Sequence, residues 1–268
     1  MKTLNNHLIL FDAECPMCRA YTRAFTYSGL LDKDGRAAYQ DLLPGDCPLV
    51  DRQRAVNEIA LVNKETGEVT YGISSLFKVA GTALPFLQPL FAFRPFLWLA
   101  ERAYAFVSYN RRVIVPAAAR GGIQPDFIPT YRLAYLALAL ILTVVLLNAY
   151  TPLMSPLLPA AGAWRELFIC SSQFLFQALV VLIFAPGRAW DYLGNMATVS
   201  LAGALLLWLV RAAGQMAGFS ATTYTLVFIL IAGLMFLEHL RRCKLLGLGL
   251  LLSVTWAAFR LAVLYFIL

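Results

Sequence analysis

A short apolar run leads into two closely spaced cysteines at residues 8–18, which read LILFDAECPMC. Residues 8–11 predict a buried β-strand, and Pro16 suits the first turn of a helix directly after it. Apolar side chains then recur at helical spacing from Met17 to Phe25. A hydrophobic strand that ends in C-x-x-C at the start of a helix is the sequence form of a thiol–disulfide redox site.

The remainder of residues 1–83 predicts a small α/β domain. It contains a second strand, a turn, a β-hairpin and a closing helix, expected at Ala37–Leu42, at Pro44–Pro48, at Ile59–Asn63 with Glu68–Tyr71, and from Ser74 or Ser75 to Gly81. The order strand, helix, strand, hairpin, helix is that of a small thioredoxin-like unit.

The chain divides into a polar head and an apolar tail. Of its 268 residues, 60% are hydrophobic, which exceeds the roughly 45–50% of soluble domains. Charged residues are scattered through residues 1–112 and nearly vanish after them. Residues 133–268 contain three acidic side chains, at Glu166, Asp191 and Glu238. A tail of this composition predicts helices embedded in a membrane.

Five apolar segments predict membrane spans, at Tyr131–Tyr150, Leu167–Ala185, Leu193–Val210, Thr223–His239 and Leu245–Leu268. Each approximates the roughly 17–25 residues that cross a bilayer, and each is apolar on every face, unlike a helix of a soluble bundle. The expected fold is an α/β thioredoxin-like domain at 1–83, amphipathic connecting helices at 84–130, and an all-α transmembrane bundle of about five spans at 131–268. The aromatic segment Leu84–Val107 packs on the head or the tail, or lies along the bilayer surface.

Basic residues predict the orientation of the spans. One side has eight of them, at Arg111, Arg112, Arg120, Arg132, Arg188, Arg241, Arg242 and Lys244, and the other side has Arg165 and Arg211. Because cytoplasmic loops are enriched in lysine and arginine, we expect a multi-pass protein of the inner (cell) membrane with a cytoplasmic head. Residues 1–6 do not lead into the apolar run of a signal peptide, which agrees with a head kept in the cytosol.

Thiol–disulfide exchange needs one thiolate that attacks and a second thiol that resolves the mixed disulfide. At a helix N-terminus, unpaired N–H groups and the helix dipole favour negative charge. We therefore expect Cys15 to be the nucleophile and Cys18, one turn later, to be the resolving thiol. Asp12 either accepts the proton that Cys18 loses when it attacks the mixed disulfide, or has only a structural role as a hydrogen-bond acceptor in a turn. The alternatives to a redox pair are inert packing and half of a zinc site, for which the head offers only Cys47 and His7 as further ligands.

Residues 10–18, with their D-x-x-C-x-x-C pattern, resemble the signature of the DCC family of putative thiol-disulfide oxidoreductases. Gly72–Leu76 resembles the second block of that family, and Tyr104–Arg111 resembles its closing Tyr…Asn-Arg segment. The resemblance covers roughly residues 7–112. It implies a thioredoxin-like fold and a redox-active C-x-x-C pair.

Two features of the chain differ from that pattern. Ala13 stands where the family usually has glycine, and no proline precedes the strand expected at Ile59–Asn63. Thioredoxins place a cis-proline there, which cradles the substrate. The resemblance therefore implies a fold more than a substrate.

Several residues of the tail carry reactive, charged or aromatic groups. We expect Cys170 to pack as a small apolar residue and Cys243, in a basic cytoplasmic loop, to accept electrons, to be lipidated or to do neither. His239 is either an interfacial anchor or a proton or quinone site. Arg260, within the last span, snorkels outward, pairs with the C-terminal carboxylate or lines a site between spans, and we favour snorkelling. Interfacial anchors are expected at Tyr150, Trp164, Trp190 and Trp208.

The function that these patterns predict is that of a membrane-tethered thiol–disulfide oxidoreductase, with Cys15, Cys18 and Asp12 as its catalytic residues and no resident cofactor or metal. The substrate is a thiol-containing protein or small molecule, and the other partner is the lipid bilayer. Two alternatives stay open: a non-enzymatic transporter or assembly factor with a redox-sensing head, and a carrier of electrons between the dithiol and a membrane quinone. The net charge of +7 is accounted for by basic residues flanking the spans and does not indicate nucleic acid.

Overall fold

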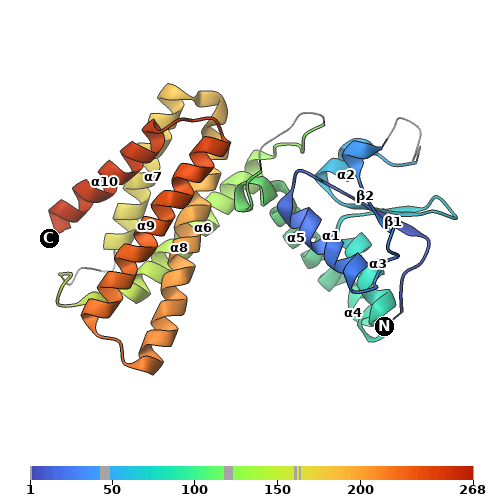
Figure 1. Ribbon diagram of the computed structural model, residues 1–268, viewed down its shortest axis with the longest axis horizontal. Helices are drawn as coiled ribbons and strands as arrows, with labels where there is room; N and C mark the ends of the chain where they lie inside the picture. The colour runs from blue at the N-terminus through green and yellow to red at the C-terminus, as the bar shows by residue number, and fades with distance from the viewer. Residues whose placement is uncertain (1, 43–48, 118–122, 160–161, 163, 268) are drawn as a thin grey trace. The chain divides into compact units, whose positions relative to one another are not determined.

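The computed structural model describes all residues except 1, 43–48, 118–122, 160–161, 163 and 268 (Figure 1). The expected turn at Pro44–Pro48, with Cys47, lies outside the described residues. The chain forms two compact units, Met1–Tyr131 and Arg132–Leu268. Each unit has its own buried apolar clusters.

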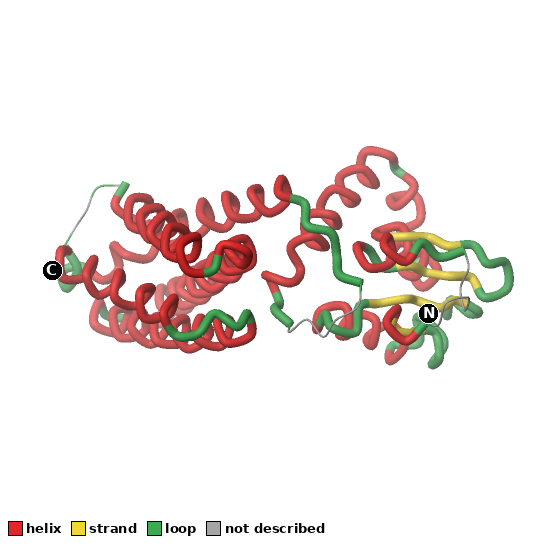
Figure 2. The backbone as a smooth tube through the Cα atoms, turned by 90° about the horizontal axis from the view of Figure 1, so that it is seen from above, coloured by secondary structure: helices red, strands yellow, loops and turns green. Residues whose placement is uncertain are grey.

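The first unit is built on a four-stranded mixed sheet with the order β2-β1-β3-β4. Its strands are β1 (His7–Phe11), β2 (Arg36–Ala38), β3 (Ala60–Asn63) and β4 (Val69–Tyr71). Strand β1 pairs parallel to β2 and antiparallel to β3, with Leu10 opposite Ala60, and β3 and β4 form the hairpin expected from the sequence. All the strands that the structure describes lie in this unit (Figure 2).

Strand β1 is apolar after His7, which agrees with a sheet that is covered on both faces. Ile9 contributes to a cluster with Leu61 and Val79, whereas Leu10 contributes to a separate cluster with Ala55 and Val62. Helices α1 (Pro16–Tyr27), α3 (Gly72–Ala83) and α5 (Arg94–Ile114) supply side chains to the first cluster, and α2 (Arg52–Asn57) supplies them to the second. Figure 1 shows these helices on opposite faces of the sheet.

Three local expectations differ from the structure. The second strand is shorter than Ala37–Leu42, because the chain turns into a 3-10 helix at Tyr39–Asp41. Helix α2 was not expected, although Asp51 caps it by accepting a hydrogen bond from the Arg54 N–H at 2.9 Å. Helix α3 begins at Gly72 and not after a cap at Ser74 or Ser75.

Gly72 explains the early start of α3. Its φ of +61° lies in the left-handed region, which lets the chain pass from β4 into a helix without a linker. Ser75 does not cap the helix, and its hydroxyl instead donates to the Thr70 carbonyl at 2.7 Å, back towards β4. The turn therefore depends on glycine and on a buried serine.

The aromatic segment after α3 packs on the first unit. A 3-10 turn (Pro85–Leu87) and helix α4 (Gln88–Ala92) precede α5. The Phe77 ring of α3 stacks on Phe91 at 4.2 Å and on Phe96 at 5.7 Å. The same segment exposes Trp98 and Leu99, so an additional contact of this face with the bilayer stays a prediction.

The second unit contains five helices among its described residues, α6 (Pro129–Tyr150, which begins in the last residues of the first unit), α7 (Arg165–Phe184), α8 (Ala189–Ala217), α9 (Ala221–Leu245) and α10 (Leu251–Ile267). Four of them, with adjoining turns, are long and apolar enough to cross a membrane. The fifth expected span corresponds to α10, an apolar helix of 17 residues. At about 1.5 Å per residue it is close to the lower limit for crossing.

Two residues of this unit occupy places that differ from those expected, and a third, His239, is too buried for the first of its two expected roles, an interfacial anchor. Tyr150 is fully buried, and its hydroxyl donates to the Tyr224 carbonyl at 2.8 Å, so it is not an interfacial anchor. Cys243 lies buried inside α9 and not in a loop. His239 is also buried in α9, where its ring contacts the Tyr192 hydroxyl at 3.2 Å and Ser253 Oγ at 2.9 Å. Cys170 is buried in an apolar cluster, as expected.

We predict that Gly72→Ala destabilises the first unit more than Gly29→Ala does. Both glycines have positive φ values, +61° and +71°, and an L-residue there costs about 1–2 kcal/mol. At Gly72 a Cβ would also lie 2.6 Å from Glu58 Oε2 and 3.4 Å from the Tyr104 ring, whereas at Gly29 it meets open space. Hydrogen exchange of β1 and β3 amides in the full-length protein measures the difference, expected at about 1 kcal/mol or more. Equal effects would contradict this account of the turn.

Candidate redox site

The two cysteines lie where β1 passes into α1, as the sequence predicts. Cys15 is the N-cap residue of α1, in an extended conformation, and Pro16 occupies the first helical position. The Cys18 N–H donates to Cys15 Sγ at 3.4 Å, so the first sulfur takes the position of a capping acceptor. Both cysteines are buried, with 1% of Cys15 and 5% of Cys18 exposed.

The two thiols have opposite acidities. A hydrogen bond from the Cys18 thiol, opposed by burial and aided by the Cys18 N–H and the positive charge of Arg111, lowers the pKa of Cys15 to about 6. The same hydrogen bond, together with burial, raises the pKa of Cys18 above its ordinary value. At neutral pH about nine-tenths of Cys15 is then thiolate while Cys18 keeps its proton. This is the asymmetry that is expected of an attacking and a resolving thiol.

Two tyrosines that the sequence analysis did not assign to the site flank the thiols. The Tyr21 hydroxyl, one turn after Cys18 on α1, hydrogen-bonds the Cys18 sulfur, and burial raises the pKa of Tyr21. Burial also raises the pKa of Tyr104 to about 12, and its hydroxyl accepts the Ile59 N–H at 3.1 Å. Both hydroxyls therefore stay protonated around the dithiol.

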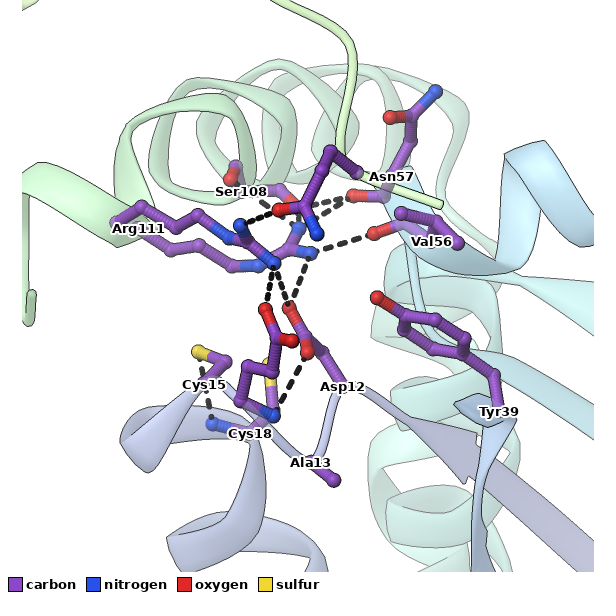
Figure 3. A network of polar contacts seen from close by, with 12 residues as sticks. Asp12, Ala13, Cys15, Cys18, Tyr39, Val56, Asn57, Ser108 and Arg111 are labelled. Atoms are coloured by element: carbon purple, nitrogen blue, oxygen red, sulfur yellow. Dashed lines mark hydrogen bonds and ion pairs between the residues drawn. The ribbon is translucent and has the colours of Figure 1, made fainter. Parts of the chain in front are cut away.

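Arg111 is the main residue of the site that the sequence analysis placed elsewhere. It was counted among the basic residues that orient the spans, but 4% of it is exposed and it lies over the dithiol (Figure 3). Its guanidinium donates to Val56 O (2.6 Å), Asn57 O (2.9 Å), Ser108 Oγ (3.0 Å), Ser108 O (3.4 Å) and Asp12 Oδ2 (3.2 Å). The sequence feature that could have placed Arg111 in the site is its position at the end of Tyr104–Arg111, the segment that resembles the closing part of the DCC family.

Asp12 lies at the end of β1 and is 2% exposed. Its oxygens accept from Arg111 and Arg112 at 3.2 Å each, from Gln40 Nε2 at 2.9 Å and from the Glu14 N–H at 3.0 Å. Burial opposes ionisation, but the two guanidinium groups outweigh it and hold the pKa of Asp12 below its ordinary value. No hydrogen bond joins Asp12 to Cys18 within the described part of the chain, so the role of proton acceptor stays a prediction.

A short segment, Ile123–Asp126, closes the same side of the site. The Tyr39 hydroxyl donates to the Ile123 carbonyl at 3.3 Å, and the Asn57 amide donates to Asp126 Oδ2 at 2.5 Å. Arg112 reaches Gln124 Oε1 and pairs with Glu14 at 3.2 Å. The Asp12 carboxylate is thus surrounded by charged and amide side chains, those of Gln40, Arg111 and Arg112.

The zinc alternative was based on His7 and Cys47. His7 lies at the start of β1, about 13 Å along the strand from Phe11, and Cys15 follows the other end of the strand. His7 Nδ1 contacts the Asn5 carbonyl at 2.7 Å. Cys47 lies outside the described residues. Among the residues that are described, no three His, Cys, Asp or Glu side chains form a group that could hold a metal ion.

No family model, no curated protein and no solved structure matches this chain. The site is therefore interpreted from its own geometry.

We predict that Arg111→Met raises the pKa of Cys15 from about 6 towards its ordinary value, because it removes the positive charge and leaves the negative charge of Asp12. The pH dependence of thiolate absorbance in the ultraviolet, with a Cys15→Ser variant subtracted, measures this pKa. Arg111→Lys keeps the charge and should keep most of the shift. Arg112→Met, which removes a guanidinium from the other side of Asp12, is the control. An unchanged Cys15 pKa in Arg111→Met would exclude this role for Arg111.

Proposed function

We propose that this chain is a membrane-anchored thiol–disulfide oxidoreductase, with Cys15 and Cys18 as its redox pair. The observation that carries the proposal is the asymmetry of the two sulfurs: one caps a helix beside a buried guanidinium and has a pKa of about 6, and the other keeps its proton. Structural cysteines in apolar surroundings have raised pKa values. A lowered pKa of a paired cysteine is a property of a reactive site.

The architecture of the first unit supports a thioredoxin-like fold and the resemblance to the DCC family. A parallel strand–helix–strand unit is followed by an antiparallel hairpin and a helix that returns to the sheet. The three segments that carry the resemblance also lie near β1. Asp12–Cys18 follows that strand, Arg111 pairs with Asp12, and a Cβ at Gly72 would lie 3.4 Å from the Tyr104 ring. This convergence is independent of the sequence pattern, since the segments lie up to 99 residues apart.

The proposed reaction is a two-step exchange. The Cys15 thiolate attacks one sulfur of a substrate disulfide, forming a mixed disulfide and releasing the other substrate sulfur as a thiolate, which takes up a proton. Cys18 then loses its proton and attacks Cys15 Sγ, which releases the second substrate sulfur. Two electrons pass from the dithiol to the substrate, and Cys15 and Cys18 end as a disulfide. The reverse sequence oxidises a substrate dithiol.

The acidity of Cys15 favours the direction in which the pair acts as an oxidant. Its pKa in the folded protein is about 6, below the ordinary 9.0, so the thiolate stabilises the folded reduced form. That stability is fully present above pH 9 and is lost as the pH falls through 6. A stabilised reduced form makes the corresponding disulfide more oxidising. We assign to Arg111 the stabilisation of this thiolate and to Asp12 the positioning of Arg111.

The membrane part supports an anchored protein, and the basic residues support a cytoplasmic head. Four helices are long and apolar enough to cross a membrane. Arg111 and Arg112 have a separate role in the dithiol site, so the eight basic residues on the proposed cytoplasmic side become six, against two on the other side. Basic residues are still more numerous on the proposed cytoplasmic side, so the proposed orientation is unchanged.

We predict that Cys18→Ser traps mixed disulfides with substrate, because the attacking thiolate of Cys15 stays and the resolving thiol is lost. Cys15→Ser should trap none, since Cys18 keeps its proton at neutral pH. Non-reducing electrophoresis of acid-quenched cells, with mass spectrometry of the trapped species, measures both. Cys170→Ser controls for thiols outside the pair. Equal trapping by the two head variants would exclude the assigned order, and a pair without a reversible two-electron potential would exclude the proposed activity.

We predict that the first unit faces the cytoplasm. Cys15 and Cys243 are buried and would react slowly with a labelling reagent. Cysteines are therefore introduced at two exposed positions, by Lys33→Cys in the first unit and by Met216→Cys near the end of α8, where the native side chain is 92% exposed. A membrane-impermeant thiol reagent should label Met216→Cys but not Lys33→Cys in intact cells, and both after lysis. Labelling of Lys33→Cys alone in intact cells would invert the orientation.

A further inference from the structure

A small cavity lies inside the second unit, between α6, α7, α8 and α10. Most of its lining is apolar, but Thr143, Gln173 and Arg260 line it together with Cys170 and the Trp256 ring. The enclosed volume is about 30 Å³. That is room for about two water molecules, or for one hydroxyl or carbonyl group of a larger ligand that lies in the mouth of the cavity.

Three polar atoms at this cavity are buried without a partner: Thr143 Oγ1, Gln173 Oε1 and Arg260 Nε. Thr143 is 4% exposed and Gln173 is 2% exposed. A buried polar group without a hydrogen bond is costly, and more so in a membrane, where lipid supplies no alternative. Of the seven such atoms among the described residues of the whole chain, these three are at one cavity.

The surroundings define what each atom needs. Gln173 Nε2 donates to the Trp256 carbonyl at 3.3 Å, which fixes the amide so that Oε1 is left as an acceptor. Arg260 Nε–H is a donor, and the guanidinium lies 5.5 Å from the centre of the Trp256 ring. Neither an ion pair nor a hydrogen bond joins Arg260 to another described residue. The site therefore requires a group that accepts from Arg260 and donates to Gln173, while Thr143 can do either.

We propose that this cavity binds the oxygen-bearing edge of a lipid-soluble quinol. A phenolic hydroxyl accepts from Arg260 and donates to Gln173 at once, whereas a carboxylate would be repelled by Gln173 Oε1. The cavity takes this hydroxyl alone, so the ring and the alkyl tail of the quinol stay in its mouth, where the Trp256 ring offers an aromatic surface. A quinone carbonyl satisfies Arg260 only. The site should therefore prefer the quinol to the quinone, by about tenfold for one lost hydrogen bond to a buried acceptor.

The proposal goes beyond the dithiol and replaces snorkelling as the role of Arg260. It concerns binding alone and is tested where the head cannot exchange electrons, in a full-length Cys15→Ser, Cys18→Ser variant in nanodiscs. The probes are duroquinol and duroquinone, whose fully substituted rings do not add to thiols. Cys170 lines the cavity but is buried, so N-ethylmaleimide, which enters the bilayer, alkylates it slowly through local opening of the bundle, and bound probe should slow that reaction further. Cys243, buried in the same unit and outside the lining, is the control within each molecule.

The expected result is protection of Cys170 by duroquinol at about tenfold lower concentration than by duroquinone, with Cys243 unaffected. Gln173→Leu should abolish the preference, Arg260→Gln should weaken binding of both forms, and Ser172→Ala, at an exposed neighbour on α7, should change neither. No protection by either probe would mean a cavity that holds water only and would overturn the proposal. Equal protection by a tetramethylphenol would assign the site to any lipid hydroxyl and would also overturn it.

Discussion

The buried ion pair between Asp12 and Arg111 is the constraint on which the first unit depends. Asp12 directly follows β1, and Arg111 lies near the end of α5. The same guanidinium donates hydrogen bonds to the Val56 and Asn57 carbonyls at the end of α2. One side chain thus fixes three elements around the dithiol. Removing Asp12 leaves the buried Arg111 guanidinium without its counter-charge, at a cost of about 3–5 kcal/mol. Helix α5 is therefore a structural part of the first unit, although its sequence suggests a connector.

Local features of this unit could be predicted because nearby residues determine them. The apolar run at 8–11 and Pro16 fix β1 and the start of α1, and Lys64–Gly67 fixes the hairpin. The place of Cys15 follows from the same short segment. These are interactions between residues a few positions apart, for which periodicity and turn chemistry are sufficient.

The rest of the site could not be predicted, because it depends on contacts between distant segments. Arg111 pairs with a residue 99 positions away, and a basic residue before an apolar span has a ready alternative explanation as a topology signal. Helix α2 has six residues, too few for a periodic pattern. Cys243 was expected in a loop because the basic residues after His239 end the apolar run, whereas helix α9 continues to Leu245. Composition also does not say that the face with His239 is buried.

The second unit keeps polar groups inside an apolar bundle by pairing them in a chain. The Tyr192 hydroxyl donates to Gln177 Oε1 at 2.6 Å and so accepts from His239 Nε2, which leaves His239 Nδ1 to accept from Ser253. Every member of this chain has a partner, which gives the helices one register. The cavity at Arg260 differs from this chain, because Thr143 Oγ1, Gln173 Oε1 and Arg260 Nε there have no hydrogen-bond partner among the described residues. Within one bundle, satisfied and unsatisfied groups thus separate structure from a candidate binding site.

The position of Cys15 as the cap of α1 makes the oxidation state of the sulfur part of the helix itself. As a thiolate, Cys15 places a negative charge on the positive end of α1 and accepts the Cys18 N–H. In the proposed reaction the Cys15–Cys18 disulfide is neutral and a weak acceptor, so oxidation removes this charge and replaces it with a covalent bridge across the first helical turn. The first turn of α1 is thus held by charge in the proposed reduced state and by a covalent bond in the proposed oxidised state.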